Sequence, residues 1–410
     1  MEINISNLET VEEIKHIFME RRQELLNFAD QGGVIFTYSC LLPKLIVHAC
    51  GGQVVKLLGI MNLFGCNNHI IDEYFSHGSE EFCTLIRDTF GLELKAPYPR
   101  NMQIVDVTTC AALTKLISMM YMEMPEFGIP HIANIPRRGG REIEDKFWLR
   151  ELVKLKEFCE EKTGQKATDE KLRESIRDEN KKKDLIKELD LVRKGDVIPI
   201  MGSECMMVIQ QQNWLRFDRY IKQLENIVEE AKERKRKGIT DYEPGAPRVL
   251  VADPCFFEPF RGEIEPYRCV KFLESCGAAV VAEDFCCGVG EHWSDIEEKE
   301  NDPDPLKTIA DFYLNVLVPC PFPTPNSRRL TKCIEAIKRL DIEGVIYMTT
   351  HACKVAAAEA RKFERAIEKE TGIPTLHIER YGDPDKELAG QLKMRVDSFV
   401  TMLKDRRNSR

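Results

Sequence analysis

Both ends of the chain alternate between short apolar runs and longer segments with helical periodicity. Near the N-terminus, residues 34–38 and 104–107 read as buried strands, and each leads through a short turn into an amphipathic helix. The first of these helices is expected to begin near Pro43, because proline suits a first helical turn. A further short strand is expected around Ile132, in PHIANIP. Strands that alternate with helices are typical of a parallel β-sheet covered by helices.

The same alternation resumes in the C-terminal part, after the proline- and glycine-containing segment DYEPGAPR. Four buried-strand patterns are predicted there, in RVLVA, AAVVAED, GVIYM and IPTLHIE. Helical patterns separate these strands, and KELAGQLKMRVDSFVTMLKD forms a closing helix. The spacing of strands and helices predicts a doubly wound, flavodoxin-like domain.

The segment between the two α/β regions is helical and strongly charged. Apolar residues such as Leu152, Leu155 and Phe158 recur near helical spacing in its first helix, and charged helical sequence continues almost to Gly245. We therefore predict an α/β chain with an N-terminal domain, a charged helical region and a C-terminal flavodoxin-like domain. Their predicted bounds are 1–138, 139–246 and 247–410.

Net charge and the distribution of apolar residues argue against nucleic acid and membrane as partners. The 410-residue chain has a formal net charge of −9, which does not favour nucleic-acid binding. The basic run at 232–237 is flanked by acidic residues and is expected to be a solvated helix end. No apolar run approaches the ~20 residues that span a bilayer, and the acidic N-terminal segment lacks a signal-peptide core. We expect a cytoplasmic protein without a membrane partner.

The 15 cysteines are the most informative feature of the composition. A reducing cytoplasm makes a disulfide framework a poor explanation, and the chain contains no CxxC motif of the zinc-ribbon or ferredoxin kind. Two interpretations remain for each cysteine: a small core residue, or a metal ligand brought to a shared site by the fold. Four cysteines lie within predicted helices and are interpreted as core or surface thiols: Cys159, Cys269, Cys276 and Cys333.

Several other cysteines fall at the ends of predicted strands, where open α/β sheets bind their ligands. Those directly after a strand are Cys110, Cys255, Cys286, Cys287 and Cys353. Cys83 instead begins a predicted helix. A helix N-terminus favours the thiolate form of cysteine, which soft metal centres require. Spacing alone leaves a shared metal site and individually packed thiols equally open.

No nucleotide-binding fingerprint follows any predicted strand. Neither GxGxxG nor GxxxxGK[ST] occurs after one of them, so we do not expect this chain to hydrolyse ATP itself.

Six segments, in this order, carry a family resemblance: TYSCLLPKLIVHACG, EEFCTLIRDTFG, DVTTCAALTKL, VVAEDFCCG, IPTLHIE and GQLKMRVDSFVTML. From about residue 33 to 403, the chain resembles the 2-hydroxyacyl-CoA dehydratase and benzoyl-CoA reductase family, of the D-component type. That family also includes double-cubane-cluster reductases. The resemblance implies two flavodoxin-like parallel-sheet domains with a helical insertion, and a [4Fe–4S] cluster between the domains.

Carried over by position, the resemblance implies that Cys83, Cys110 and Cys353 bind the cluster. Many relatives have the sequence Tyr-Cys at the first turn, whereas this chain has Tyr38, Ser39 and Cys40 there. The serine resembles that of catalytic dehydratase subunits, where a hydroxyl faces an open iron. Cys40 stays a possible further ligand.

Other residues near the implied cluster keep more than one interpretation. Ser39 is alternatively a helix cap. His351 is either a donor to cluster or substrate or a plain surface residue. Cys286 and Cys287 stay unassigned, because adjacent cysteines point apart.

The activity implied by the resemblance is low-potential, one-electron chemistry on a CoA thioester. An ATP-dependent iron–sulfur activator would supply electrons to a dimer of this chain with a homologous smaller subunit or with itself. The product would come from dehydration of a 2-hydroxyacyl-CoA, a lyase reaction, or from reduction of an acyl- or aryl-CoA. Two alternatives stay open: a homodimeric reductase of another small molecule with a double-cubane [8Fe–9S] cluster, and a non-catalytic electron-transfer protein with a closed cluster.

Overall fold

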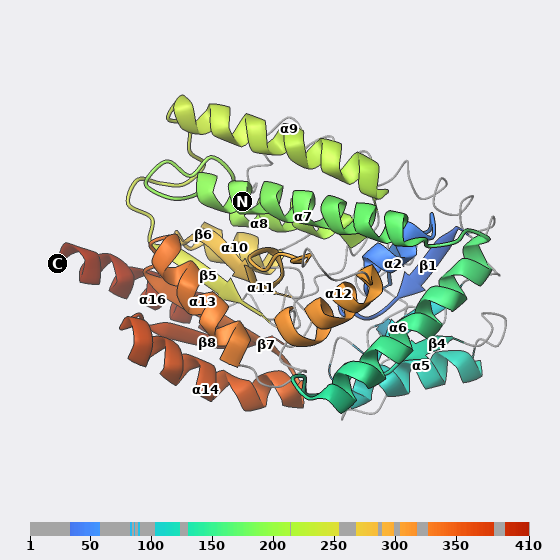
Figure 1. Cartoon of the computed structure of the whole chain (residues 1–410). Coiled ribbons are helices and arrows are strands. Elements are labelled where there is room, and N and C mark those ends of the chain that lie inside the picture. Colours follow the sequence, from blue (N-terminus) through green and yellow to red (C-terminus); the bar gives the residue numbers. More distant parts are fainter. Residues whose placement is uncertain are drawn as a thin grey trace.

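The computed structural model describes most of the chain from residue 33 onward. The described residues are 33–57, 83, 86, 89–90, 103–123, 130–213, 215–253, 268–285, 289–298, 304–317, 327–380 and 390–409. Within them lie two parallel sheets and a set of long helices, which Figure 1 shows in sequence colours from blue to red.

Among the described residues, the N-terminal sheet has four parallel strands in the order β2-β1-β3-β4. The strands are β1 (Val34–Thr37), β2 (Gln53–Lys56), β3 (Gln103–Val107) and β4 (His131–Ala133). Strands β1 and β2 are buried at every position, as expected for a sheet with helices on both faces. Helix α2 (Lys44–Ala49) follows Pro43, as predicted, and α5 (Ala111–Glu123) follows β3.

The C-terminal sheet repeats this arrangement with the order β6-β5-β7-β8, again all parallel. Its strands are β5 (Arg248–Ala252), β6 (Ala279–Asp284), β7 (Gly344–Thr350) and β8 (Thr375–Arg380). In both sheets the second strand lies outside the first, which is the start of the flavodoxin-like order. The predicted α/β class, with two parallel sheets and flanking helices, is confirmed.

Several helices of the C-terminal half flank this second sheet (Figure 1). They are α10 (Arg268–Ser275), α11 (Val289–His292), α13 (Ser327–Arg339), α14 (Lys354–Thr371) and α16 (Gln391–Asn408). Helix α12 (Pro305–Asp311) and the short π-helical turn that continues it, η3 (Phe312–Val316), instead pack on α6 and share the apolar core of the first sheet.

The charged middle of the chain forms four helices and one 3-10 turn, η2 (Gln211–Asn213). The helices are α6 (Glu142–Thr163), α7 (Asp169–Val192), α8 (Gly202–Gln210) and α9 (Phe217–Arg236). The charged sequence after α6 reads as a continuation, but the helix ends at Gly164, whose φ of 70° terminates it. A new helix begins at Thr168, whose side chain accepts a hydrogen bond from the Lys171 N–H.

Helix α7 ties the two sheets together. It packs on α2 and α12 beside the first sheet and on α11 beside the second, and Figure 1 shows α7 and α9 crossing the molecule above both sheets. On α7, Asn180 exchanges hydrogen bonds with the backbone of Ile296, and the buried Lys183 ammonium donates to the Ser294 carbonyl at 2.8 Å. The helical region is therefore part of the common core.

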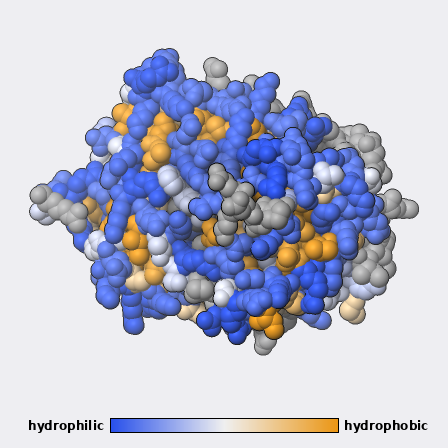
Figure 2. Space-filling model, in the orientation of Figure 1, coloured by the Kyte–Doolittle hydropathy of each residue, from blue (hydrophilic) through white to orange (hydrophobic). Residues whose placement is uncertain are grey.

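The face seen in Figure 1 is mostly hydrophilic, and Figure 2 shows its apolar side chains in small separate patches. Among the described residues, no helix is long and apolar enough to cross a membrane.

Candidate functional site

Cys110 lies in the turn that connects β3 to α5. Its Sγ accepts a hydrogen bond from the Leu113 N–H at 3.4 Å, within the first turn of the helix. The Arg137 guanidinium donates to the carbonyl of Thr109, immediately before the cysteine. Helix N–H groups and a nearby cation both favour a thiolate, so the turn is suited to a cysteine that binds metal.

Cys353 lies in the corresponding turn of the second sheet, between β7 and α14. Its N–H bonds to the Thr350 carbonyl at 3.0 Å, and its own carbonyl accepts from Ala357 at the start of the helix. Ala352 has a φ of 60°, in the left-handed region that non-glycine residues rarely adopt. Backbone strain of this kind concentrates at functional sites, and here it lies in the residue directly before Cys353, which is the N-cap of α14.

The fold brings these two cysteines and Cys83 together from three separate segments. Burial raises the pKa of the Cys110 thiol, and nearby Cys353 raises it further, while Arg137 and the N–H groups of Leu113 and Ala112 oppose this. Cys83 packs against the small cluster of Cys353 and Ala356, at the first turn of α14. Three thiols that are far apart in sequence thus lie near one another: Cys83 packs beside Cys353, and Cys353 is close enough to Cys110 to raise its pKa.

Ser39 lies at the end of β1, the strand beside β3. It is buried, and its Oγ accepts from the Leu41 N–H at 3.0 Å, so it stabilises the turn that precedes α2. The helix begins only at Lys44, so the hydroxyl does not cap the helix itself.

Asp106 connects the Ser39 turn to the Cys110 turn. Its carboxylate accepts from the Val107 N–H at 2.9 Å and from the N–H groups of Ser39 and Tyr38. Burial raises its pKa to about 7, although these hydrogen bonds oppose the rise. The sequence pattern did not single this residue out, and the only signal was an acidic residue inside an otherwise apolar strand.

Cys40 belongs to a different environment from the other three predicted ligands. It packs against an apolar cluster that contains Ile35, Leu41 and Val105, whereas Cys83 and Cys110 pack against the cluster that contains Phe36 and Ile104. Residues that alternate along β1 and β3 point to opposite faces of the sheet. The described contacts therefore place Cys40 with the core of the other face.

His351 lies in the Cys353 turn, with a half-exposed side chain. Its Nδ1 lies 3.0 Å from the Glu379 Oε1 on the neighbouring strand β8. The ring is thus positioned by a carboxylate, as a donor to a ligand would be, and the opposite ring nitrogen faces away from that partner.

The remaining comparison with the sequence concerns four helix cysteines, interpreted as core or surface thiols, and three further cysteines that follow predicted strands. Cys159, Cys269 and Cys333 are buried, as expected, and Cys276 is half-buried. Cys255, Cys286 and Cys287 lie outside the described residues.

A second group of potential metal ligands consists of Asp190, Cys205 and Glu283, whose ligand atoms all lie within 4.8 Å of one another. The buried Arg193 guanidinium fills this position, donating to Glu283 at 2.5 and 2.9 Å and to Asp190 at 2.7 Å. Burial also raises the pKa of the Cys205 thiol well above its ordinary value, so the thiol is neutral. We interpret the group as an ion-pair network that fastens α7 to β6, not as a cation site.

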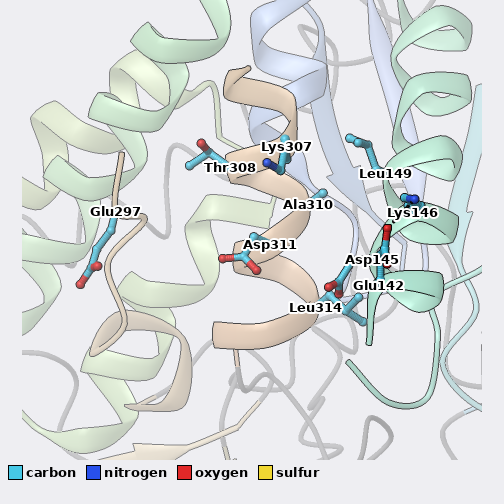
Figure 3. Close-up of a pocket in the computed structure, with 10 residues that line it drawn as sticks. All are labelled: Glu142, Asp145, Lys146, Leu149, Glu297, Lys307, Thr308, Ala310, Asp311 and Leu314. Atoms are coloured by element: carbon cyan, nitrogen blue, oxygen red, sulfur yellow. Dashed lines mark ion pairs between the residues drawn. The ribbon is translucent and has the colours of Figure 1, made fainter. Parts of the chain in front are cut away.

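A cavity of about 470 Å³ lies between α6 and α12 (Figure 3). Its lining mixes acidic and basic side chains, including Asp145, Lys146, Lys307 and Asp311. None of the four predicted ligand cysteines is among the described residues that line it, so this cavity is separate from the site where the cysteines meet.

Comparison with known proteins identifies the kind of protein that carries these turns. The family model described as 2-hydroxyglutaryl-CoA dehydratase, D-component, matches residues 40–403, nearly all of the chain. The chain belongs to this family. Membership confirms the predicted resemblance and makes the chain an enzyme subunit of the dehydratase or CoA-reductase type.

Two relatives show how much of the chain is similar to known proteins of this kind. The putative dehydratase subunit YjiM of Escherichia coli strain K12 is 26% identical over 399 residues, which is 94% of this chain and 97% of that protein. One of the subunits of benzoyl-CoA reductase from Thauera aromatica is 21% identical over 329 residues, 78% of each chain.

Proposed function

We propose that this chain is the cluster-bearing subunit of a low-potential radical enzyme that dehydrates a 2-hydroxyacyl-CoA or reduces an acyl- or aryl-CoA. The observation that carries this proposal is the meeting of Cys83, Cys110 and Cys353 at two helix N-termini. Membership in the dehydratase D-component family supports the same reaction class.

The donor set fits an iron–sulfur cluster. Three thiols from separate segments converge, and N–H groups of α5 already point at the Cys110 sulfur, as they would toward a thiolate or sulfide. Cys83, Cys110 and Cys353 would hold a [4Fe–4S] cluster, which supplies one-electron transfer at low potential and one iron without a cysteine ligand. Cys40, which packs on the other face of the sheet, is the least suited of the four candidates.

The protein's own contribution is to place polar groups beside that iron. The Ser39 oxygen already accepts from Leu41, which leaves its O–H to donate to a hydroxyl or carbonyl oxygen of the substrate. Asp106 holds the Ser39 and Cys110 turns in one arrangement through their backbone N–H groups. His351, oriented by Glu379, would donate to the thioester region of the substrate.

Electrons and partners follow from the same proposal. No nucleotide fingerprint follows a strand of this chain, so a separate ATP-dependent iron–sulfur activator would deliver the electron. The relative from Thauera aromatica is one subunit of its reductase, which supports a complex with a homologous smaller subunit or with a second copy of this chain. The reaction would take place in the cytoplasm under anaerobic conditions.

The proposed activity is tested by anaerobic co-expression with an activator ATPase and incubation with ATP and a panel of CoA thioesters. Loss of water from a 2-hydroxyacyl-CoA, or addition of two electrons and two protons to an acyl- or aryl-CoA, would be followed by mass spectrometry of the CoA esters. We expect turnover that requires both ATP and the activator, and a large loss of turnover in Ser39→Ala. Turnover of no thioester by a cluster-loaded complex would contradict the proposal.

A second candidate is a double-cubane reductase of a small molecule, a type of enzyme that the family resemblance also includes. Its larger cluster would need ligands beyond Cys83, Cys110 and Cys353. A homodimer with about eight irons per chain and no thioester turnover would support this candidate. A cluster with four cysteine ligands and no turnover would indicate a non-catalytic electron-transfer protein.

A further inference from the structure

A buried ion pair crosses the end of the C-terminal sheet beneath the Cys353 turn. Arg380, the last residue of β8, donates to the Asp253 carboxylate at 2.5 Å, and Asp253 directly follows β5. Strand β7 lies between β5 and β8 in this sheet. The guanidinium therefore spans the strand that leads into Cys353, and both partners are buried, with 7% and 1% of their surface exposed.

Arg380 also contacts the turn itself at two points. Its carbonyl accepts from the His351 N–H at 2.7 Å, and its guanidinium donates to the Thr350 hydroxyl at 3.4 Å. These two residues immediately precede Ala352, whose backbone adopts the left-handed conformation. A residue held in that conformation persists only where its surroundings fix it, and Arg380 bonds to both residues that precede this one.

Asp253 is itself anchored to the sheet. Its N–H bonds to the Asp284 carbonyl at 2.9 Å, so it extends the pairing of β5 with β6. Arg380 thus fastens the turn to three strands at once: β8 through its own backbone, β7 through Thr350, and β5 through Asp253.

We propose that Arg380 is the positioning residue of the Cys353 turn, acting through Asp253 and Thr350. It holds the turn in the strained shape that places the Cys353 sulfur beside Cys110 and Cys83. The consequence for cluster binding rests on the proposed function, whereas the consequence for the turn holds in the metal-free protein. Both bonds come from one guanidinium nitrogen, whose two N–H bonds have fixed directions in the guanidinium plane, whereas a lysine ammonium rotates freely on a flexible stem.

The experiment compares Arg380→Met, Arg380→Lys and Arg248→Met as full-length, metal-free proteins. Arg248 is a matched control, because it is equally buried at 7% exposure and donates to the carbonyls of Leu340 and Gly195 at the opposite end of the same sheet. The rate at which iodoacetamide alkylates Cys353, measured by peptide mass spectrometry, reports how readily the Cys353 turn opens. Cys333, buried on α13, reports unfolding of the whole domain.

In Arg380→Met, we expect Cys353 to be alkylated several-fold faster than in the wild type, while the rate at Cys333 is unchanged. In Arg380→Lys, the alkylation rate at Cys353 should lie between the wild-type rate and the Arg380→Met rate. This variant keeps the test informative if the methionine variant does not fold. Arg248→Met should leave the ratio of the two rates at the wild-type value. An unchanged Cys353 rate in Arg380→Met, or equal acceleration at Cys333, would overturn the proposal.

The cluster-loaded protein provides a second measurement. The electron paramagnetic resonance spectrum of the reduced cluster should change line shape in Arg380→Met and keep the wild-type shape in Arg248→Met. A wild-type chain that binds no iron would refute the cluster and leave the alkylation result to decide the role of Arg380. An unchanged spectrum in an Arg380→Met protein whose Cys353 rate is also unchanged would refute the positioning role.

Discussion

The Cys110 and Cys353 turns show two ways to build the same feature. Each cysteine is the third residue after the third strand of a sheet with the same strand order, and each begins a helix. The first turn holds no residue with positive φ among those described, whereas the second contains Ala352 at 60°. The strand order thus determines the position of each cysteine in its sheet, whereas local contacts determine the backbone conformation of each turn.

The two turns also differ in how their buried acids are stabilised. Asp106 accepts backbone N–H groups of its own and the neighbouring strand, and its pKa rises to about 7. Asp253 instead bonds a buried arginine. The first turn should therefore respond to pH, and the second to loss of its cation.

The largest expected effect comes from removing a cysteine of either turn. Cys110→Ala, Cys353→Ala and Cys83→Ala should each abolish the electron paramagnetic resonance signal of the reduced cluster, because each removes a thiolate ligand. Cys159→Ala is the control, since that thiol is buried in the core on α6 and should leave the signal intact. A full signal in Cys353→Ala would mean that the two turns do not share a metal site.

A smaller effect is expected from Asp106→Asn. The folded-state pKa of about 7 lies above the ordinary value of 3.8, so the stability due to the neutral acid is complete below about pH 4 and is lost as the pH rises through 7. The difference between these two pKa values corresponds to at most about 4 kcal/mol of stability. We expect the asparagine variant to show a flatter dependence of Tm on pH between about 4 and 7.

Glu274→Gln provides the matched control for that pH dependence. Glu274, on α10, is buried and accepts a hydrogen bond from the Gly202 N–H at the start of α8, away from both turns, and burial raises its pKa to about 7 as well. Both substitutions should flatten the dependence of Tm on pH by a similar amount. Only Asp106→Asn should also change the rate at which Cys110 is alkylated. A slope unchanged by Asp106→Asn would show that this acid is already ionised in the folded protein.

The smallest effect concerns the backbone of the second turn. Ala352→Gly relieves a left-handed conformation and should raise the free energy of unfolding by up to about 1 kcal/mol, whereas Ala352→Val should lower it by about 1–2 kcal/mol. The exposed Ala358, within α14, is the control, because Ala358→Gly should cost about 1 kcal/mol. Chemical denaturation measures all three, and a destabilising Ala352→Gly would contradict the strain assigned to this turn.

Much of the fold was predictable from the sequence, because the signals were local. Apolar runs predicted the strands, and Pro43 predicted the start of α2. The break between α6 and α7 was missed, because the charged sequence around it keeps helical periodicity and only Gly164 and Thr168 mark it.

The candidate site was predictable only in part. The three cysteines followed from family resemblance, since spacing could not distinguish ligands from core thiols. The contacts of Asp106, Arg380 and Asp253 depend on which strands become neighbours, and no local pattern shows that. The position of Cys40 on the other face of the sheet likewise needed the observed packing.

The central claim is that one iron–sulfur cluster joins the two turns. Its most direct test is iron and acid-labile sulfide analysis of the anaerobically purified wild-type chain beside Cys110→Ala and Cys353→Ala. We predict about four irons and four sulfides per wild-type chain and almost none in either variant. A metal-free wild-type chain, or full iron content in both variants, would contradict the claim.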